Sequence, residues 1–432
     1  MRSRREDAGD GDRAFFPGEL LAMAVAAAMG ATLTFLYATS CFVPRVPFES
    51  PYLTYDAFRY DFMAHAMSRW PVERILTDEV VSLKEPGYAR LLAVLYSFVG
   101  HEPILGCAAN WGLWLAAGLL LVPVAADRHP RGRRVGAVFL ILWMLVPEAV
   151  DWSGTTSKEP LCAFLLALSL WLARAAERAG PLRLALVVGS TAAVAAVATE
   201  IRSAVVLLSL LPIAIVCELR VRRSTMPWAF AVTLFGLTAS FLGLAGNVAE
   251  AITKEDFAKT GSAFAHGVWA AGYSSDSVLL RIGSENRWLD LLAVPVRGLA
   301  HIAVPLNTSP WTLPLAQVAA PSLLVWASAA TYTGLAIAMG LRLRDRLRRP
   351  AAALPSMRVA LICTSLSALF LLGITGIIHE RYRSILLPAF LPLGVPSLLD
   401  ELREHGATRM ATVWTLGGML VAVAYAGLKY VF

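Results

Sequence analysis

Residues 18–42, GELLAMAVAAAMGATLTFLYATSCF, form an apolar run of 25 residues with a single charged side chain, Glu19. A helix needs about 20 apolar residues to cross the hydrocarbon core of a bilayer, so this run predicts a membrane-spanning helix. It is too long for the core of a signal peptide, which takes roughly 7–15 residues, and no convincing cleavage site follows it. The preceding residues 1–17 include four arginines, so the positive-inside rule predicts a cytoplasmic tail and a helix that runs outward.

The composition of the whole chain agrees with this interpretation. Of its 432 residues, 57% are hydrophobic and 16% are charged, and the mean hydropathy is +0.60. Soluble domains carry about 25% charged residues. A net charge of +7 would favour nucleic-acid binding in a soluble protein, but here the arginines lie in short loops between apolar segments, as they do in membrane proteins. We therefore expect an all-α, polytopic membrane protein that binds no nucleic acid.

The alternation of apolar segments with basic and polar loops predicts about eleven spanning helices, with the N-terminus cytoplasmic and the C-terminus outside. After the first, the predicted spans are 103–126, 135–150, 160–173, 184–199, 204–218, 227–248, 317–341, 359–378, 385–399 and 411–432. The apolar segments 87–100 and 291–306 are shorter than a span needs, so we expect the first to be interfacial or re-entrant and do not count the second. Residues 18–432 then form one transmembrane domain, with extracytoplasmic loops at about 43–102 and 249–316.

The first outer loop contains the stretch YDAFRYDFMAH, residues 55–65, which combines two acids, a histidine, an arginine and two tyrosines. In a helix, Asp56 and Tyr60 share one face, and Asp61 lies one turn before His65 on another. A carboxylate beside lipid is partly desolvated, which raises its pKa towards the working pH and suits a general base. The alternative is an amphipathic interfacial helix with solvated acids and with aromatic residues that anchor it among the headgroups.

The same topology places several further ionisable residues on the outer side of the membrane. They are Lys84, Glu85, Asp151, Lys158, Glu159, Glu200, Arg202, His379, Glu380, Arg381 and Arg383. Charges at membrane depth are costly and usually face a cavity, so the convergence of these loops predicts one site at the outer surface. The alternative for Glu200 and Arg202 is an ion pair within the membrane.

Two of these groups suit particular chemistry. Glu159 stands at the expected start of a helix, where the helix dipole stabilises an anion, although capping of that helix and snorkelling are an equal alternative. Arg381 and Arg383 lie in a short outer turn, contrary to the positive-inside rule. Two arginines at this spacing can bind a phosphate or pyrophosphate bidentately, so we expect an anion site there.

Several short motifs together resemble the GT-C superfamily of integral-membrane glycosyltransferases, such as the protein mannosyltransferases and the aminoarabinose transferases. They are the acid-bearing first loop, PGY at 86–88 running to FVG at 98–100, SKEP at 157–160, and ERYR at 380–383 followed by LP at 387–388. The resemblance implies an inverting transfer from a polyprenyl-phosphate sugar to a glycan, lipid or protein acceptor. It also implies a location in the bacterial inner membrane with an extracytoplasmic active face.

Carried onto this sequence, the resemblance implies that Asp56 or Asp61 is the catalytic base, with Glu159 as a further catalytic candidate. Arg381 and Arg383 would then hold the lipid phosphate. The other expected substrate-binding residues are Tyr60, His65, Glu85, Lys158, Arg202, His379 and Glu380. The two acids of the first loop, which are often adjacent in that family, are separated in this chain by the four residues between Asp56 and Asp61.

Two other function classes stay open at this point. A polysaccharide polymerase or ligase would act on an undecaprenyl-pyrophosphate-linked glycan through the same arginines. A lipid-linked-glycan transporter would require internal repeats and interrupted helices, and we find no convincing repeat. The five cysteines show no paired spacing, and no zinc-type ligand spacing is present, so we expect no cofactor and no obligatory metal, with a divalent ion left open.

Overall fold

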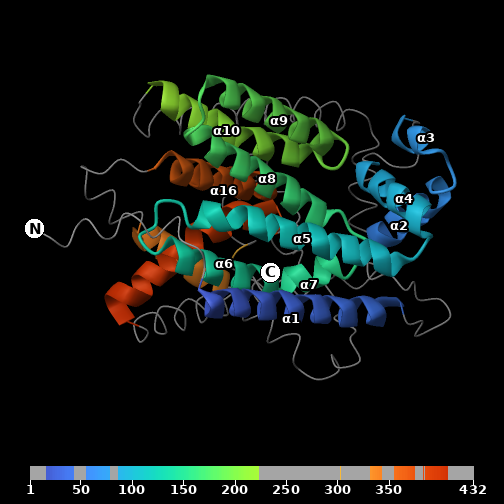
Figure 1. The fold of residues 1–432 in the computed structure, drawn as a ribbon, viewed down its shortest axis with the longest axis horizontal. Coiled ribbons are helices and arrows are strands. Elements are labelled where there is room, and N and C mark those ends of the chain that lie inside the picture. Colours follow the sequence, from blue (N-terminus) through green and yellow to red (C-terminus); the bar gives the residue numbers. More distant parts are fainter. Residues whose placement is uncertain are drawn as a thin grey trace, which may run out of the picture.

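The computed structural model of the protein describes residues 16–42, 55–77, 86–222, 302, 331–342, 355–374, 383 and 385–406. The secondary structure within these ranges is helical, with no strand among them, which confirms the predicted all-α class. Long helices lie side by side, and the short helices α2, α3 and α4 gather at one end of the bundle (Figure 1).

The helices fall into two groups by length. The long ones are α1 (Pro17–Phe42), α5 (Pro103–Ala125), α8 (Glu159–Glu177), α9 (Pro181–Thr199), α10 (Ser203–Arg222), α16 (Ser356–Ile374) and the last described helix, Ile385–Gly406. The short ones are α2 (Tyr55–Met67), α3 (Val72–Thr77), α4 (Gly87–Val99), α6 (Gly132–Leu145), α7 (Pro147–Ser153) and residues 331–342.

Five of the described helices are long and apolar enough to cross a membrane: α1, α5, α8, α9 and Ile385–Gly406. Large apolar side chains such as Leu21 on α1 and Leu182 on α9 are exposed, as expected where a helix faces lipid. The described residues therefore have the character of a helical integral membrane protein. The eleven predicted spans are not confirmed, because the segments 227–248 and 411–432 and most of 317–341 lie outside the described residues.

The predicted span 135–150 is broken in the structure. Helix α6 ends at Leu145, Val146 is extended with φ −64° and ψ 140°, and α7 begins at Pro147. Proline has no N–H to donate to the preceding turn, and its ring pushes the residue before it out of the helical region. A hydrophobicity pattern does not register this break, because the residues on both sides of it are apolar.

A pair of stacked tryptophans fixes α5 against α6. The rings of Trp114 and Trp143 lie 4.4 Å apart at 16°, and each indole N–H donates to the other residue's backbone carbonyl, at 3.0 and 2.8 Å. Gly118, one turn along α5, allows this close approach, because a Cβ there would lie 2.5 Å from Trp143 Cδ1. The helix pair is thus held by both packing and hydrogen bonds that satisfy two buried indoles.

The basic turns meet at one end of the bundle, which we call the basic end. There Arg128 pairs with Glu177 at 2.7 Å, Arg174 pairs with Asp127 at 3.1 Å, and Arg220 donates to the Ala176 carbonyl at 2.7 Å. These contacts join the α5–α6 turn to the ends of α8 and α10, in agreement with the predicted alternation of basic turns. Helices α2 and α4 lie at the opposite end, which we call the polar end (Figure 1).

Candidate functional site

The polar end is built around Asp61, whose carboxylate is buried by the packing of α2 against α4. The residue is 1% exposed. The Tyr96 hydroxyl donates to Asp61 Oδ1 at 2.6 Å, and His101 Nε2 lies 2.9 Å from Asp61 Oδ2. The alternative of solvated acids is therefore wrong for Asp61, although Phe58 and Phe62 on the other face are exposed and stacked as interfacial anchors would be.

His65 and His101 complete this cluster. Their ring centroids are 4.0 Å apart, and Arg69 Nη2 lies 3.3 Å from His65 Nε2. Desolvation, with the nearby His101 and Arg69, lowers the pKa of His65 below its ordinary value, against the opposing effect of Asp61. The predicted placement of Asp61 and His65 on one face of the helix is confirmed, since both lie against His101.

The chemistry of the Asp61–His101 pair follows from its hydrogen bonds. Burial first, and then the bond to Asp61, raise the pKa of Tyr96, so its hydroxyl stays protonated and can donate. A carboxylate beside imidazole Nε2 favours the tautomer with the proton on that nitrogen, which leaves the Nδ1 lone pair as the acceptor. The His101 side chain is 28% exposed. The part of this pair that a substrate can reach is thus the imidazole, with the carboxylate behind it.

The second cluster lies at the start of α8. Lys158 Nζ donates to the Ile201 carbonyl at 2.9 Å, and Arg202 Nη2 lies 3.2 Å from Glu159 Oε1. Glu159 and Lys158 are both buried, so these contacts tie α8 to the turn between α9 and α10. The predicted helix start at Glu159 is confirmed, and the anion sits in the first turn of α8, where the dipole favours it.

Tyr60 connects the two clusters. Lys158 Nζ lies 5.7 Å from the centroid of the Tyr60 ring, and that ring meets Tyr88 edge-on at 5.4 Å. The Tyr88 hydroxyl donates to Asn110 Oδ1 at 3.0 Å, and Asn110 Nδ2 donates to the carbonyls of Thr155 and Ser157 at 2.7 and 3.0 Å. The turn before α8 is therefore fixed by buried side chains of α4 and α5.

Helix α4 also contacts the turn between α9 and α10. Arg90 Nη1 lies 3.0 Å from Glu200 Oε2, and the Gly87 N–H donates to the Glu200 carbonyl at 2.8 Å. The expected alternative was an ion pair between Glu200 and Arg202. Instead, Glu200 pairs with α4 and Arg202 pairs with α8, so the α9–α10 turn is held from two sides.

The structure thus brings together six of the predicted site residues: Tyr60, Asp61, His65, Lys158, Glu159 and Arg202. Arg383 is also buried, with its guanidinium carbon 5.5 Å from the centroid of the Tyr332 ring. Asp56 lies in the first turn of α2, and its side chain is outside the description. Glu85, His379, Glu380 and Arg381 lie outside the described residues. Within the described part of the chain, no group of three or more His, Cys, Asp or Glu residues is arranged to hold a metal.

Sequence reasoning missed the two partners of Asp61. Tyr96 and His101 lie 35 and 40 residues further along the chain. His101 stands between the apolar segment 87–100 and the start of α5, and a polar residue in so short a connection between apolar helices was the available signal. Asn110, the buried amide inside the predicted span 103–126, was a second such signal.

No protein-family model matches this chain, and the searches of curated proteins and of solved structures found no match.

Proposed function

We propose that the protein is a membrane glycosyltransferase that moves a sugar from a polyprenyl-phosphate donor to a hydroxyl acceptor at the extracytoplasmic face of a bacterial inner membrane. The observation that carries the proposal is the buried Asp61–His101 pair at the polar end. Such a pair is an arrangement for accepting a proton, and it lies in a helical membrane protein, where a lipid-linked substrate is accessible.

The proposal assigns the proton transfer to His101, with Asp61 acting through it. The acceptor hydroxyl attacks the anomeric carbon, and the bond between that carbon and the phosphate oxygen breaks. The hydroxyl proton passes to His101 Nδ1 while the phosphate leaves with the bonding electrons. Asp61 holds the imidazole in the required tautomer and stabilises the imidazolium that forms, and Tyr96 fixes the carboxylate from its other side. A single displacement of this kind inverts the anomeric carbon.

The remaining predicted residues take supporting parts in the proposal. Lys158 lies against the ring of Tyr60, the residue before Asp61 in α2, and we propose that its charge favours a phosphate-bearing substrate there. Arg202 is paired with Glu159 at the start of α8. Glu159 is the partner of Arg202, so we propose a positioning role for it in place of a catalytic one. Arg381 and Arg383 stay as the proposed ligands of the donor phosphate.

The direct test is an assay with the purified full-length protein in liposomes and a radiolabelled polyprenyl-phosphate sugar. The proposal predicts release of polyprenyl phosphate, with the label transferred to a hydroxyl acceptor. A polymerase or ligase would require a pyrophosphate-linked glycan, and a transporter would move the label across the bilayer without cleaving it. Either of those results, with no release of polyprenyl phosphate, would reject the proposal.

The orientation has its own test, because the proposal needs the polar end outside. Glu73→Cys at the polar end and Arg183→Cys at the basic end are both exposed positions. In intact cells a membrane-impermeant maleimide should label the first variant, and the second only after permeabilisation. Labelling of both from one side would contradict the proposed topology.

A further inference from the structure

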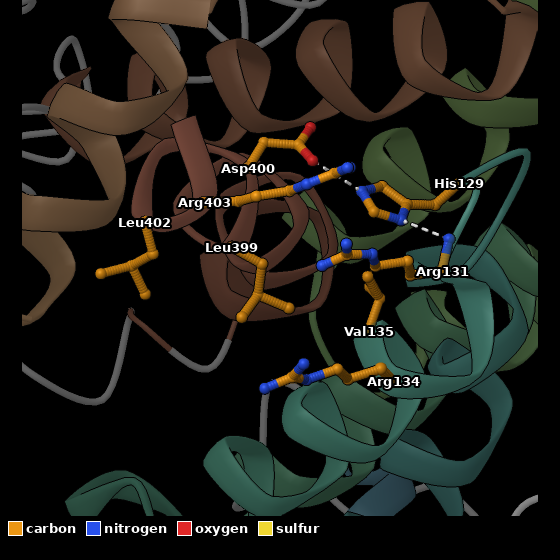
Figure 2. A pocket seen from close by; sticks show the side chains of 8 residues that line it. All are labelled: His129, Arg131, Arg134, Val135, Leu399, Asp400, Leu402 and Arg403. Atoms are coloured by element: carbon orange, nitrogen blue, oxygen red, sulfur yellow. Dashed lines mark hydrogen bonds and ion pairs between the residues drawn. The ribbon is translucent and has the colours of Figure 1, made fainter. Parts of the chain in front are cut away.

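The basic end contains a cavity of about 270 Å³ between the start of α6 and the last described helix. Its lining residues are His129, Arg131, Arg134, Val135, Leu399, Asp400, Leu402 and Arg403 (Figure 2). The side chains of Arg131 and Arg403 extend into the space between the two elements, with Arg134 beside Val135 on α6 (Figure 2). All three arginines are exposed, so a ligand can reach them from solvent or from the membrane surface.

The acid in this cavity is already engaged. The backbone N–H of Arg131 donates to His129 Nδ1 at 3.1 Å, so that nitrogen is an acceptor and Nε2 is the ring nitrogen that faces Asp400 as a donor. His129 Nε2 then donates to Asp400 Oδ1 at 3.1 Å. The lining thus carries three arginine charges against one carboxylate, and His129 already contacts that carboxylate. The net charge of the lining is positive.

Other arginines at the basic end have carboxylate partners nearby. Arg128 pairs with Glu177, Arg133 with Glu19, and Arg342 with Glu401 and Glu404. For the cavity arginines Arg131, Arg134 and Arg403, the described residues provide no carboxylate at ion-pair distance. Their charges are thus available for an anion, within the part of the chain that the structure describes.

A second, mostly apolar cavity of about 570 Å³ adjoins the first and shares Arg131 and Arg134 with it. Its remaining lining comes from the start of α1 and from α6: Phe16, Gly18, Glu19, Ala22, Arg133, Ala137, Val138 and Ile141. The acid Glu19 is neutralised by Arg133 at 3.0 Å. From Arg134 to Ile141 the groove follows α6 for about 10 Å, at the helical rise of roughly 1.5 Å per residue.

We propose that these two cavities form one binding site for an anionic phospholipid. The phosphate lies among Arg131, Arg134 and Arg403, and an acyl chain follows the groove between α1 and α6. The reason for choosing a lipid over a free phosphate is that the cationic and apolar cavities share two arginines, which suits an amphiphile. Basic pockets between membrane helices on the cytoplasmic side are suited to anionic headgroups, and the predicted topology places the basic end on that side. This site is independent of the proposed transferase chemistry at the polar end.

The test measures binding of phosphatidylglycerol to the delipidated full-length protein in detergent, by native mass spectrometry. Phosphatidylcholine and inorganic phosphate serve as competing probes. We expect phosphatidylglycerol to bind more tightly than phosphatidylcholine. The binding of phosphatidylglycerol should become about fivefold weaker in each of three variants, Arg131→Gln, Arg134→Gln and Arg403→Gln. This is the size expected for one basic charge near an anionic surface. Arg183→Gln, an exposed arginine of the same end outside both cavities, is the matched control and should leave binding unchanged.

A groove variant separates the lipid from a free phosphate. Ala22 is exposed on α1, so Ala22→Trp fills the groove without disturbing the core. Ala22→Trp should weaken the binding of phosphatidylglycerol and leave any binding of inorganic phosphate unchanged. The proposal is overturned if phosphatidylcholine binds equally well, if Arg183→Gln costs as much as the cavity variants, or if Ala22→Trp has no effect on the lipid. Thermal unfolding of each variant without lipid shows that the fold is kept.

Discussion

His101 Nε2 and Asp61 Oδ2 lie 2.9 Å apart, although the two residues are 40 positions apart in the sequence. The carboxylate is buried and the imidazole is partly exposed. A buried acid can hold a histidine in one tautomer without meeting the substrate itself. Under the proposed function, Asp61 therefore acts through His101 and not as the base itself, and this determines which substitutions should abolish activity.

Replacement of Asp61 by Asn should lower turnover in the polyprenyl-phosphate assay by roughly 10²–10⁴-fold, the usual size of general acid–base catalysis. The amide keeps the shape but no longer stabilises the imidazolium or fixes the tautomer. His101→Gln should cost a similar factor, and the double variant little more, because the two residues act as a unit. The measurement is single-turnover release of polyprenyl phosphate.

The control for that prediction is Asp56→Asn, the other acid of the first outer loop. It should retain turnover within a few-fold of the unchanged protein if Asp61 and His101 form the reacting pair. Loss of activity in Asp56→Asn with full activity in Asp61→Asn would reverse the assignment, and full activity in both would favour the polymerase alternative.

His65 predicts a pH dependence of stability. Its pKa in the folded protein is lowered from the ordinary value of 6.5, so the unfolded chain takes up the proton first as the pH falls. The stabilisation from neutral His65 is therefore complete above that value and is lost progressively below it. Thermal unfolding in detergent should show a loss of stability between pH 7.5 and 5, a range that extends about one unit or more on each side of the ordinary pKa. His65→Gln should reduce that loss. His405→Gln at the basic end controls for the removal of an imidazole, and an equal reduction there would refute this account.

The five long apolar helices of the described residues could be predicted from the sequence, because hydrophobicity and length indicate them. The predicted segments 103–126 and 184–199 agree with α5 and α9 to within a few residues. The break at Val146 was missed because a run of apolar residues hides the effect of Pro147 on the backbone. Within the site, helical spacing placed Asp61 and His65 on one face correctly. Their partner His101 was missed because it depends on how α4 folds back on α2, and no local pattern contains that contact.

The surroundings of two glycines of α5 predict that replacement by alanine changes stability in opposite directions. A Cβ at Gly118 would lie 2.5 Å from Trp143 Cδ1, whereas a Cβ at Gly112 meets nothing within 4 Å. Gly118→Ala should therefore lower the free energy of unfolding by about 1–3 kcal/mol, since the stacked tryptophans must shift. Gly112→Ala should be neutral or stabilising by up to about 1 kcal/mol from helix propensity. Denaturant titration in micelles compares the two, and equal effects would mean that the Trp114–Trp143 contact does not limit the approach of α5 to α6.

The two ion pairs of the α9–α10 turn should differ in strength because they differ in burial. The side chains of Glu159 and Arg202 are 4% and 11% exposed, whereas that of Glu200, the partner of Arg90, is 50% exposed. Removing one charge of a buried pair leaves the other uncompensated, so Glu159→Gln should lower the free energy of unfolding by about 3–5 kcal/mol. Glu200→Gln removes a partly solvated, screened partner and should cost at most about 1 kcal/mol.

Raising the salt concentration should weaken the Arg90–Glu200 contribution to stability and leave the Glu159–Arg202 contribution nearly unchanged, since buried charges are poorly screened. A double-mutant cycle for each pair gives both values, and a larger coupling for the exposed pair would show that Glu159 does not hold the turn.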